Sequence, residues 1–115
     1  MIHFTIPMPP STNALFATVK GRRIKTRTYK AWITEAGWMV LQQRQAGKTW
    51  VTGDCVVSII AGPRNRRADL DNKVKACLDL LKRQSLIVDD SDVVELHIRW
   101  GDVDGLDVTI RGVGP

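Results

Sequence analysis

The segment from residue 70 to residue 84 constrains the fold most strongly, because its apolar side chains recur at a helical interval. They stand at positions i, i+4, i+7, i+8 and i+11, namely Leu70, Val74, Cys77, Leu78 and Leu81. Residues at this spacing share one face of an α-helix, and such a face is stable when it is buried. The segment therefore predicts an amphipathic helix that rests on a sheet, with Asp69 at its beginning.

The residues around this helix have the composition of strands. Residues 51–61 are rich in β-branched side chains and end at Gly62 and Pro63, which is typical of a core strand. Other segments alternate apolar and polar residues or are bounded by turn residues: 2–8, a strand or ragged hairpin with a basic tip within 14–27, 93–100 and 106–111. Together these segments predict a sheet for the helix to cover.

A second helix is predicted between Thr28, a suitable N-cap, and Gly47, a suitable stop. Its apolar residues again follow a helical spacing: Trp32, Ala36, Met39 and Val40. Two main helices packed on a mixed β-sheet predict the α+β class. No repeat, linker or low-complexity segment divides the chain, so we expect one domain over residues 1–115.

Composition narrows the chemistry that such a domain can perform. A chain of 115 residues with 43% hydrophobic residues can form its own core without a disulfide. Cys55 and Cys77 are expected to be buried small apolar residues, and with only two histidines there is no ligand set for zinc. The sequence shows no leader and no membrane span, so a cytoplasmic protein is expected, and any metal should have oxygen ligands.

Charge is unevenly distributed along the chain, whose formal net charge is +5. Residues 20–30 hold six lysines or arginines and no acid, whereas residues 89–107 hold seven acids and one arginine. Basic blocks are typical of proteins that bind a polyanion such as DNA, although an ordinary solvated face is the alternative. The candidate DNA-binding residues are Lys20, Arg22, Arg23, Lys25, Arg27, Lys30, Arg64, Arg66, Arg67 and Lys73.

Aspartates stand at both ends of the helix predicted for residues 70–84. Asp69 and Asp71 bracket its beginning, and Asp90 lies in an acidic turn that follows it. Carboxylates are the ligands that Mg²⁺ prefers, together with water and phosphate oxygens. The alternatives are helix capping by Asp69 or Asp71 and a solvated acidic turn at residues 89–92. The spacing alone does not show that the carboxylates converge.

Lys75 follows Asp71 by four residues, so both lie on one side of the predicted helix. One interpretation is an exposed ion pair, worth about 0.2–0.5 kcal/mol. The other is a cation that faces the scissile phosphate and offsets the charge of the transition state. The two interpretations are compatible.

The segment RRADLDNKVKACLDLLKRQSLIVDDSDV resembles the signature of the RusA family of Holliday junction resolvases, and PPSTN at residues 9–13 resembles its N-terminal motif. The resemblance implies a RusA-like fold in which Asp69, Asp71 and Asp90 bind Mg²⁺, or Mn²⁺ as a substitute, and Lys75 assists catalysis. It also implies a homodimer that makes paired nicks in four-way junctions, without a small-molecule cofactor. Ala68 departs from the family's basic run, and Asn72, Asp89 and Asp92 have no assigned role.

The function predicted from the sequence is thus a Mg²⁺-dependent nuclease that resolves Holliday junctions in DNA recombination and repair. Two alternatives remain at this point: a non-catalytic module that binds junctions or single strands, and a nuclease for other branched nucleic acids. Tryptophans that stack on unpaired bases would be consistent with either of these two alternative functions. Scattered tryptophans in a small domain are more often part of its core, which is the expectation for Trp32, Trp38, Trp50 and Trp100.

Overall fold

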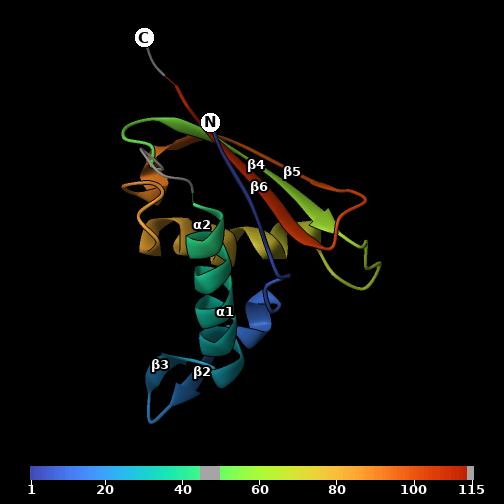
Figure 1. Cartoon of the computed structure of the whole chain (residues 1–115). Coiled ribbons are helices and arrows are strands. Elements are labelled where there is room, and N and C mark those ends of the chain that lie inside the picture. Colours follow the sequence, from blue (N-terminus) through green and yellow to red (C-terminus); the bar gives the residue numbers. More distant parts are fainter. Residues whose placement is uncertain (45–49, 114–115) are drawn as a thin grey trace.

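The computed structural model describes residues 1–44 and 50–113 (Figure 1). Its strands are β1 (Ile2–Ile6), β2 (Phe16–Val19), β3 (Arg22–Lys25), β4 (Cys55–Gly62), β5 (Val93–Trp100) and β6 (Gly105–Gly112). Its α-helices are α1 (Arg27–Gln43) and α2 (Val74–Arg83), and its 3₁₀ helices are η1 (Thr12–Ala14), η2 (Leu70–Lys73) and η3 (Asp90–Asp92). The predicted strands and both predicted helices are therefore present, with boundaries shifted by a few residues.

The main sheet has the strand order β1-β6-β4-β5. The β4–β5 pair is parallel and the other pairs are antiparallel, so the sheet is mixed. Parallel neighbours need a long crossover connection, and here η2, α2 and η3 supply it. With its two helices and the separate β2–β3 hairpin, the chain is a compact α+β domain, as predicted.

The strand register sorts side chains by polarity onto the two faces of the main sheet. Phe4 on β1 lies opposite Val108 on β6, and Val108 lies opposite Ile59 on β4. All three are buried in the core. One residue further along, the same register brings together polar residues, because side chains alternate between faces. The helices therefore pack on one face, and the other face is largely polar.

Helix α1 begins one residue after Thr26, so the predicted N-cap Thr28 is wrong. The Thr26 hydroxyl accepts a hydrogen bond from the Tyr29 amide at 3.1 Å and donates one to the Ala14 carbonyl at 2.6 Å. Thr28 is an exposed residue within the first turn. At the other end the helix stops at Gln43, and the predicted stop Gly47 lies outside the described residues.

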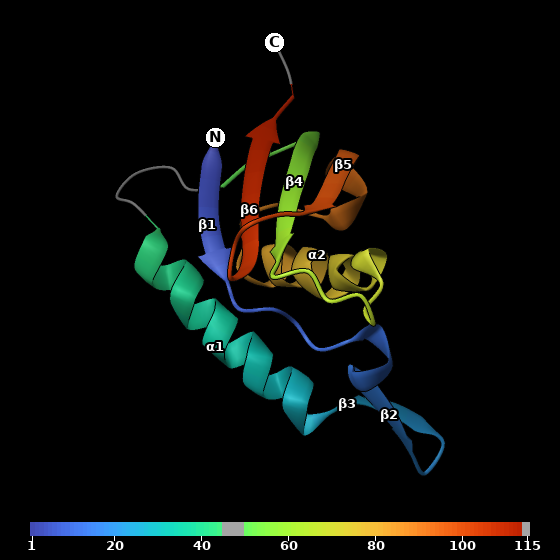
Figure 2. The same ribbon diagram turned by 90° about the vertical axis from the view of Figure 1, so that its right-hand side faces the viewer.

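The β2–β3 hairpin projects from the body of the molecule beyond the first turn of α1 (Figure 2). Its turn consists of Lys20 and Gly21, so of the two alternatives predicted for residues 14–27, a strand or a hairpin with a basic tip, the hairpin is the one present. Phe16 anchors it by an edge-to-face contact with Tyr29, with ring centroids 5.7 Å apart. The guanidinium of Arg23 stacks on the Phe16 ring, 4.0 Å from the ring centre. The hairpin is thus a fixed basic arm.

Burial was predicted for the cysteines and tryptophans, and the structure confirms it for some of them but not for others. Both cysteines are buried and free, and burial raises the pKa of the Cys77 thiol to about 12. Trp32 belongs to the core and donates a hydrogen bond to the Pro7 carbonyl at 2.9 Å. Trp38 and Trp50, however, are 62% and 45% exposed, so the core prediction is wrong for these two. Within the described ranges, no helix is long and apolar enough to cross a membrane.

Candidate functional site

Asp69 stands where the basic loop after β4 becomes η2. Its backbone is extended, with φ −81° and ψ 134°, which is the conformation of an N-cap residue. Its side chain nevertheless makes no capping hydrogen bond, and the residue is exposed. The capping alternative therefore does not describe how the Asp69 carboxylate is used.

Asp71 lies in the first turn of η2 and is also exposed. Its carbonyl oxygen accepts a hydrogen bond from the Val74 amide, where η2 passes into α2. The Asp69 carbonyl accepts one from the Asn72 amide at 3.3 Å. The main-chain oxygens of both aspartates thus build the turn, and their carboxylates remain at the surface, where they can accept a cation or the hydrogens of water.

In the acidic turn after α2, the neighbouring residues Asp89 and Asp90 differ in their contacts. The Asp89 carboxylate accepts a hydrogen bond from the Ser91 amide at 3.4 Å and lies 3.7 Å from the Lys82 ammonium. The pKa of Asp89 is lowered, first by a hydrogen bond with the Asp90 side chain and then by the Ser91 amide and Lys82. Asp89 is therefore the structural acid that caps η3, while Asp90 is exposed one residue further on.

The two groups of aspartates lie at opposite ends of α2. Asp69 and Asp71 precede the helix, whereas the Lys82–Asp89 contact holds η3 against its last turn. A helix of 10 residues is about 15 Å long. Accordingly, no three His, Cys, Asp or Glu side chains in the described part of the chain are grouped closely enough to hold a metal ion. Within a single chain, Asp69 and Asp71 therefore lie at one end of α2 and Asp90 lies at the other.

Lys75 does not pair with Asp71 but with Asp79, one turn further along α2, at 3.8 Å. Asp79 also accepts a hydrogen bond from the Tyr29 hydroxyl at 3.5 Å, and burial and Asp79 together raise the pKa of Tyr29. The Lys75 side chain is 51% exposed. Lys75 is the second residue of α2, so it lies at the same end of the helix as Asp71.

The predicted DNA-binding residues occupy two places. The first is the projecting hairpin and the beginning of α1, where the basic side chains are exposed apart from the half-buried Lys25: Lys20, Arg22, Arg23, Lys25, Arg27 and Lys30. The second is the end of the main sheet around η2, where Arg64, Arg66 and Arg67 are exposed but Lys73 is buried. The basic residues therefore form two separate groups, one in the loop that leads into Asp69 and one on the projecting hairpin and the beginning of α1.

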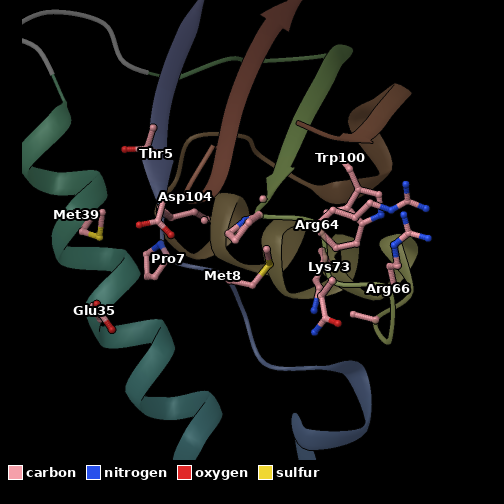
Figure 3. Close-up of a pocket in the computed structure, with 16 residues that line it drawn as sticks. Thr5, Pro7, Met8, Glu35, Met39, Arg64, Arg66, Lys73, Trp100 and Asp104 are labelled. Atoms are coloured by element: carbon pink, nitrogen blue, oxygen red, sulfur yellow. The ribbon is translucent and has the colours of Figure 1, made fainter. Parts of the chain in front are cut away.

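A cleft of about 630 Å³, lined by Ala68 and Lys73 on either side of Asp69 in the sequence, opens between the end of β1, helix α1 and the loop after β4 (Figure 3). Arg64, Arg66, Lys73 and Trp100 gather at one end, and Glu35 and Asp104 stand at the other. From the sequence, Trp100 was expected to belong to the core, with stacking on unpaired bases as the alternative. It is the last residue of β5 and meets the loop after β4 only because the two strands are parallel.

The family profile described as Endodeoxyribonuclease RusA matches residues 7–111. The chain belongs to the RusA family. This RusA-family protein is therefore a Holliday junction endodeoxyribonuclease, a nuclease that acts on branched DNA. A search among curated proteins gives no match.

The RusA match includes both groups of aspartates, Lys75, the hairpin and the cleft except for Thr5 and Ile6. The exposed oxygens of Asp69 and Asp71 suit a hard divalent cation, because such ions take carboxylate oxygens and keep several waters. No described residue holds either carboxylate in a hydrogen bond or ion pair of its own. The donor set thus fits Mg²⁺ in chemistry, with two protein ligands from η2 and room for others.

Proposed function

We propose that this RusA-family nuclease resolves four-way DNA junctions in a Mg²⁺-dependent reaction, with Mn²⁺ as a substitute metal. The observation that carries the proposal is the free Asp69 carboxylate. It stands at an N-cap position without capping, next to a second free carboxylate from Asp71. Two exposed carboxylates that no other side chain engages can both bind a divalent cation, and such a cation can at the same time bind an oxygen of a DNA phosphate.

The residues around η2 then have separate tasks. Asp69 and Asp71 hold the cation, which when bound supplies Lewis acidity and a water of lowered pKa. Lys75 places its ammonium near the scissile phosphate and offsets the negative charge that develops there. Arg64, Arg66 and Arg67 bind the neighbouring phosphates, while the β2–β3 hairpin grips a junction arm through its backbone, without reading sequence.

In this proposal, Asp90 reaches the metal site of a second copy of the chain. The α2 helix, about 15 Å long, lies between Asp90 and the η2 aspartates of its own chain. We propose that the protein is a two-fold homodimer in which Asp90 of each chain completes the site built on η2 of the other. Two equivalent sites related by a two-fold axis would produce paired nicks in a junction that has the same symmetry.

Cleavage of a synthetic four-way junction tests the proposal, with linear duplex, flap and single-strand controls and with Mg²⁺ or EDTA. We expect Mg²⁺-dependent paired nicks near the crossover. Asp69→Asn should abolish them while junction binding persists, because Asn keeps the shape of the side chain and removes its charge. Asp102→Asn, at an exposed aspartate in the β5–β6 turn, is the matched control and should cut normally.

Two outcomes would contradict the proposal. Junction binding without any nick, over a range of divalent metals, would leave a structure-selective binding protein. If the protein cuts the flap efficiently but leaves the four-way junction intact, the metal-dependent nuclease activity would stand and the assigned substrate would be wrong.

A further inference from the structure

The cleft beside η2 contains a lysine for which the protein provides no partner. Lys73 is only 6% exposed, yet it has no hydrogen bond or ion pair with any residue in the described ranges. No buried side-chain nitrogen or oxygen among those residues lacks a hydrogen-bond partner, so the Lys73 ammonium must reach solvent. Because Lys73 lines the cleft, the ammonium is exposed to the space within it.

The Lys73 ammonium therefore faces the cleft without a carboxylate that balances its charge. A bound anion would compensate, since charge-assisted hydrogen bonds are among the strongest that proteins make. Arg64 and Arg66 line the same end of the cleft. Three cations at one end predict a phosphate as the anion.

The same end of the cleft also offers a surface for a flat ring. Trp100 lines the cleft at the end where Arg64 and Lys73 lie, and Met8 also lines the cleft (Figure 3). A nucleotide has both features, a phosphate and a flat base, and bases stack readily on tryptophan. The volume of about 630 Å³ lies within the roughly 300–1,000 Å³ of pockets that take small ligands.

The opposite end of the cleft sets the direction in which such a ligand lies. Glu35 on α1 and Asp104 in the β5–β6 turn carry negative charge there and repel phosphates. A base pair inside a duplex cannot present the face of its base to a side chain, so the occupant must be unpaired. We propose that the cleft holds one unpaired nucleotide of the junction, with its phosphate at Lys73 and its base against Trp100.

This inference rests on the proposed function, because branched DNA is the source of the unpaired nucleotide. Its test is equilibrium binding of a fluorescent six-nucleotide single strand in EDTA, followed by anisotropy. We expect Lys73→Met and Trp100→Leu each to weaken binding about tenfold, the size of effect that loss of one stacked base produces. Arg111→Met is the control, since it removes one charge at the far end of β6, and binding should weaken less than about twofold.

A second measurement uses the wild-type protein and therefore does not depend on how the variants fold. An oligomer of the same length that lacks its bases should bind about tenfold more weakly to the wild type, and equally to Trp100→Leu. Equal losses in Lys73→Met and Arg111→Met would show diffuse attraction and overturn the inference. Displacement of the strand by an equal concentration of a free deoxynucleoside monophosphate would also overturn it, because the cleft would then be a small-molecule site.

The two proposals fail in different ways. Binding is measured without a divalent metal, so Asp69→Asn should bind the single strand like the wild type. If the wild type cuts no junction but the losses in Lys73→Met and Trp100→Leu are found, the nuclease proposal fails and the nucleotide cleft stands. If cutting is found and both variants bind normally, the cleft assignment fails alone.

Discussion

Asp69 and Asp89 stand at equivalent positions, each immediately before a 3₁₀ turn. The Asp89 side chain caps its turn and pairs with Lys82. The Asp69 side chain does neither. An aspartate that satisfies main-chain amides has used the lone pairs that a metal would need, whereas one that leaves them free can bind it. This difference separates the structural acid Asp89 from the candidate ligands Asp69 and Asp71.

Lys75 provides a prediction at the same scale. Its ion pair with Asp79 is exposed, so breaking it should change the free energy of unfolding by less than about 0.5 kcal/mol. We expect Lys75→Met to unfold at nearly the same urea concentration as the wild type, but to cut junctions about a hundredfold more slowly. Single-turnover cleavage and urea denaturation measure the two quantities separately.

Asp79→Asn is the matched control for Lys75→Met. It breaks the same ion pair but keeps the ammonium, and its amide oxygen can still accept the hydrogen bond from Tyr29. Cleavage by this variant should stay close to that of the wild type. Equal losses of cleavage in the two variants would mean that the pair acts as a structural unit, and would remove Lys75 from the reaction.

At the scale of elements, the connection between the hairpin and α1 depends on Thr26. Its hydroxyl caps α1 at the Tyr29 amide and bonds the Ala14 carbonyl before β2. Thr26→Ala removes both bonds and should lower the free energy of unfolding by about 1–2 kcal/mol. Because Thr26 follows directly on β3, the hairpin should also become less ordered. Urea denaturation and hydrogen exchange of the hairpin amides measure these effects.

Thr28→Ala is the control in the same turn of α1. Thr28 is exposed and caps nothing, and alanine has the higher helix propensity. This variant should be as stable as the wild type or slightly more stable. A larger loss in Thr28→Ala than in Thr26→Ala would contradict the assignment of the cap.

At the scale of the whole molecule, the parallel β4–β5 crossover keeps Asp90 apart from Asp69 in its own chain. Mixing inactive variants tests whether a second copy supplies it. In a heterodimer of Asp69→Asn and Asp90→Asn chains, one site contains both substitutions and the other contains neither. A randomly assorted mixture should regain about a quarter of the wild-type nicking, as single nicks.

The separate variants, each refolded alone, are the controls and should stay inactive. If each site were built within one chain, every site of the heterodimer would carry one substitution and the mixture would stay inactive as well. That result, obtained with a heterodimer confirmed by two affinity tags, would contradict the shared site.

The elements with a strong local pattern could be predicted from the sequence. The helical spacing from Leu70 to Leu81 predicts α2, the β-branched run predicts β4, and basic residues around Gly21 predict the hairpin tip. Local patterns suffice there because burial of one face and tight turns act over a few neighbouring residues. The cap of α1 was missed because Thr26 and Thr28 are chemically equal, and only contact with Ala14 selects between them.

The sequence by itself determined the RusA family, the α+β class and the identity of the candidate acids. Only the tertiary structure decided that Asp69 is free, that Asp90 lies at the far end of α2, and that Lys73 opens into a cleft beside Trp100. The physical reason is that these properties depend on residues distant in sequence. Spacing along a chain specifies which face of an element a residue occupies, but a distance across the fold is set by how strands pair and helices cross between them.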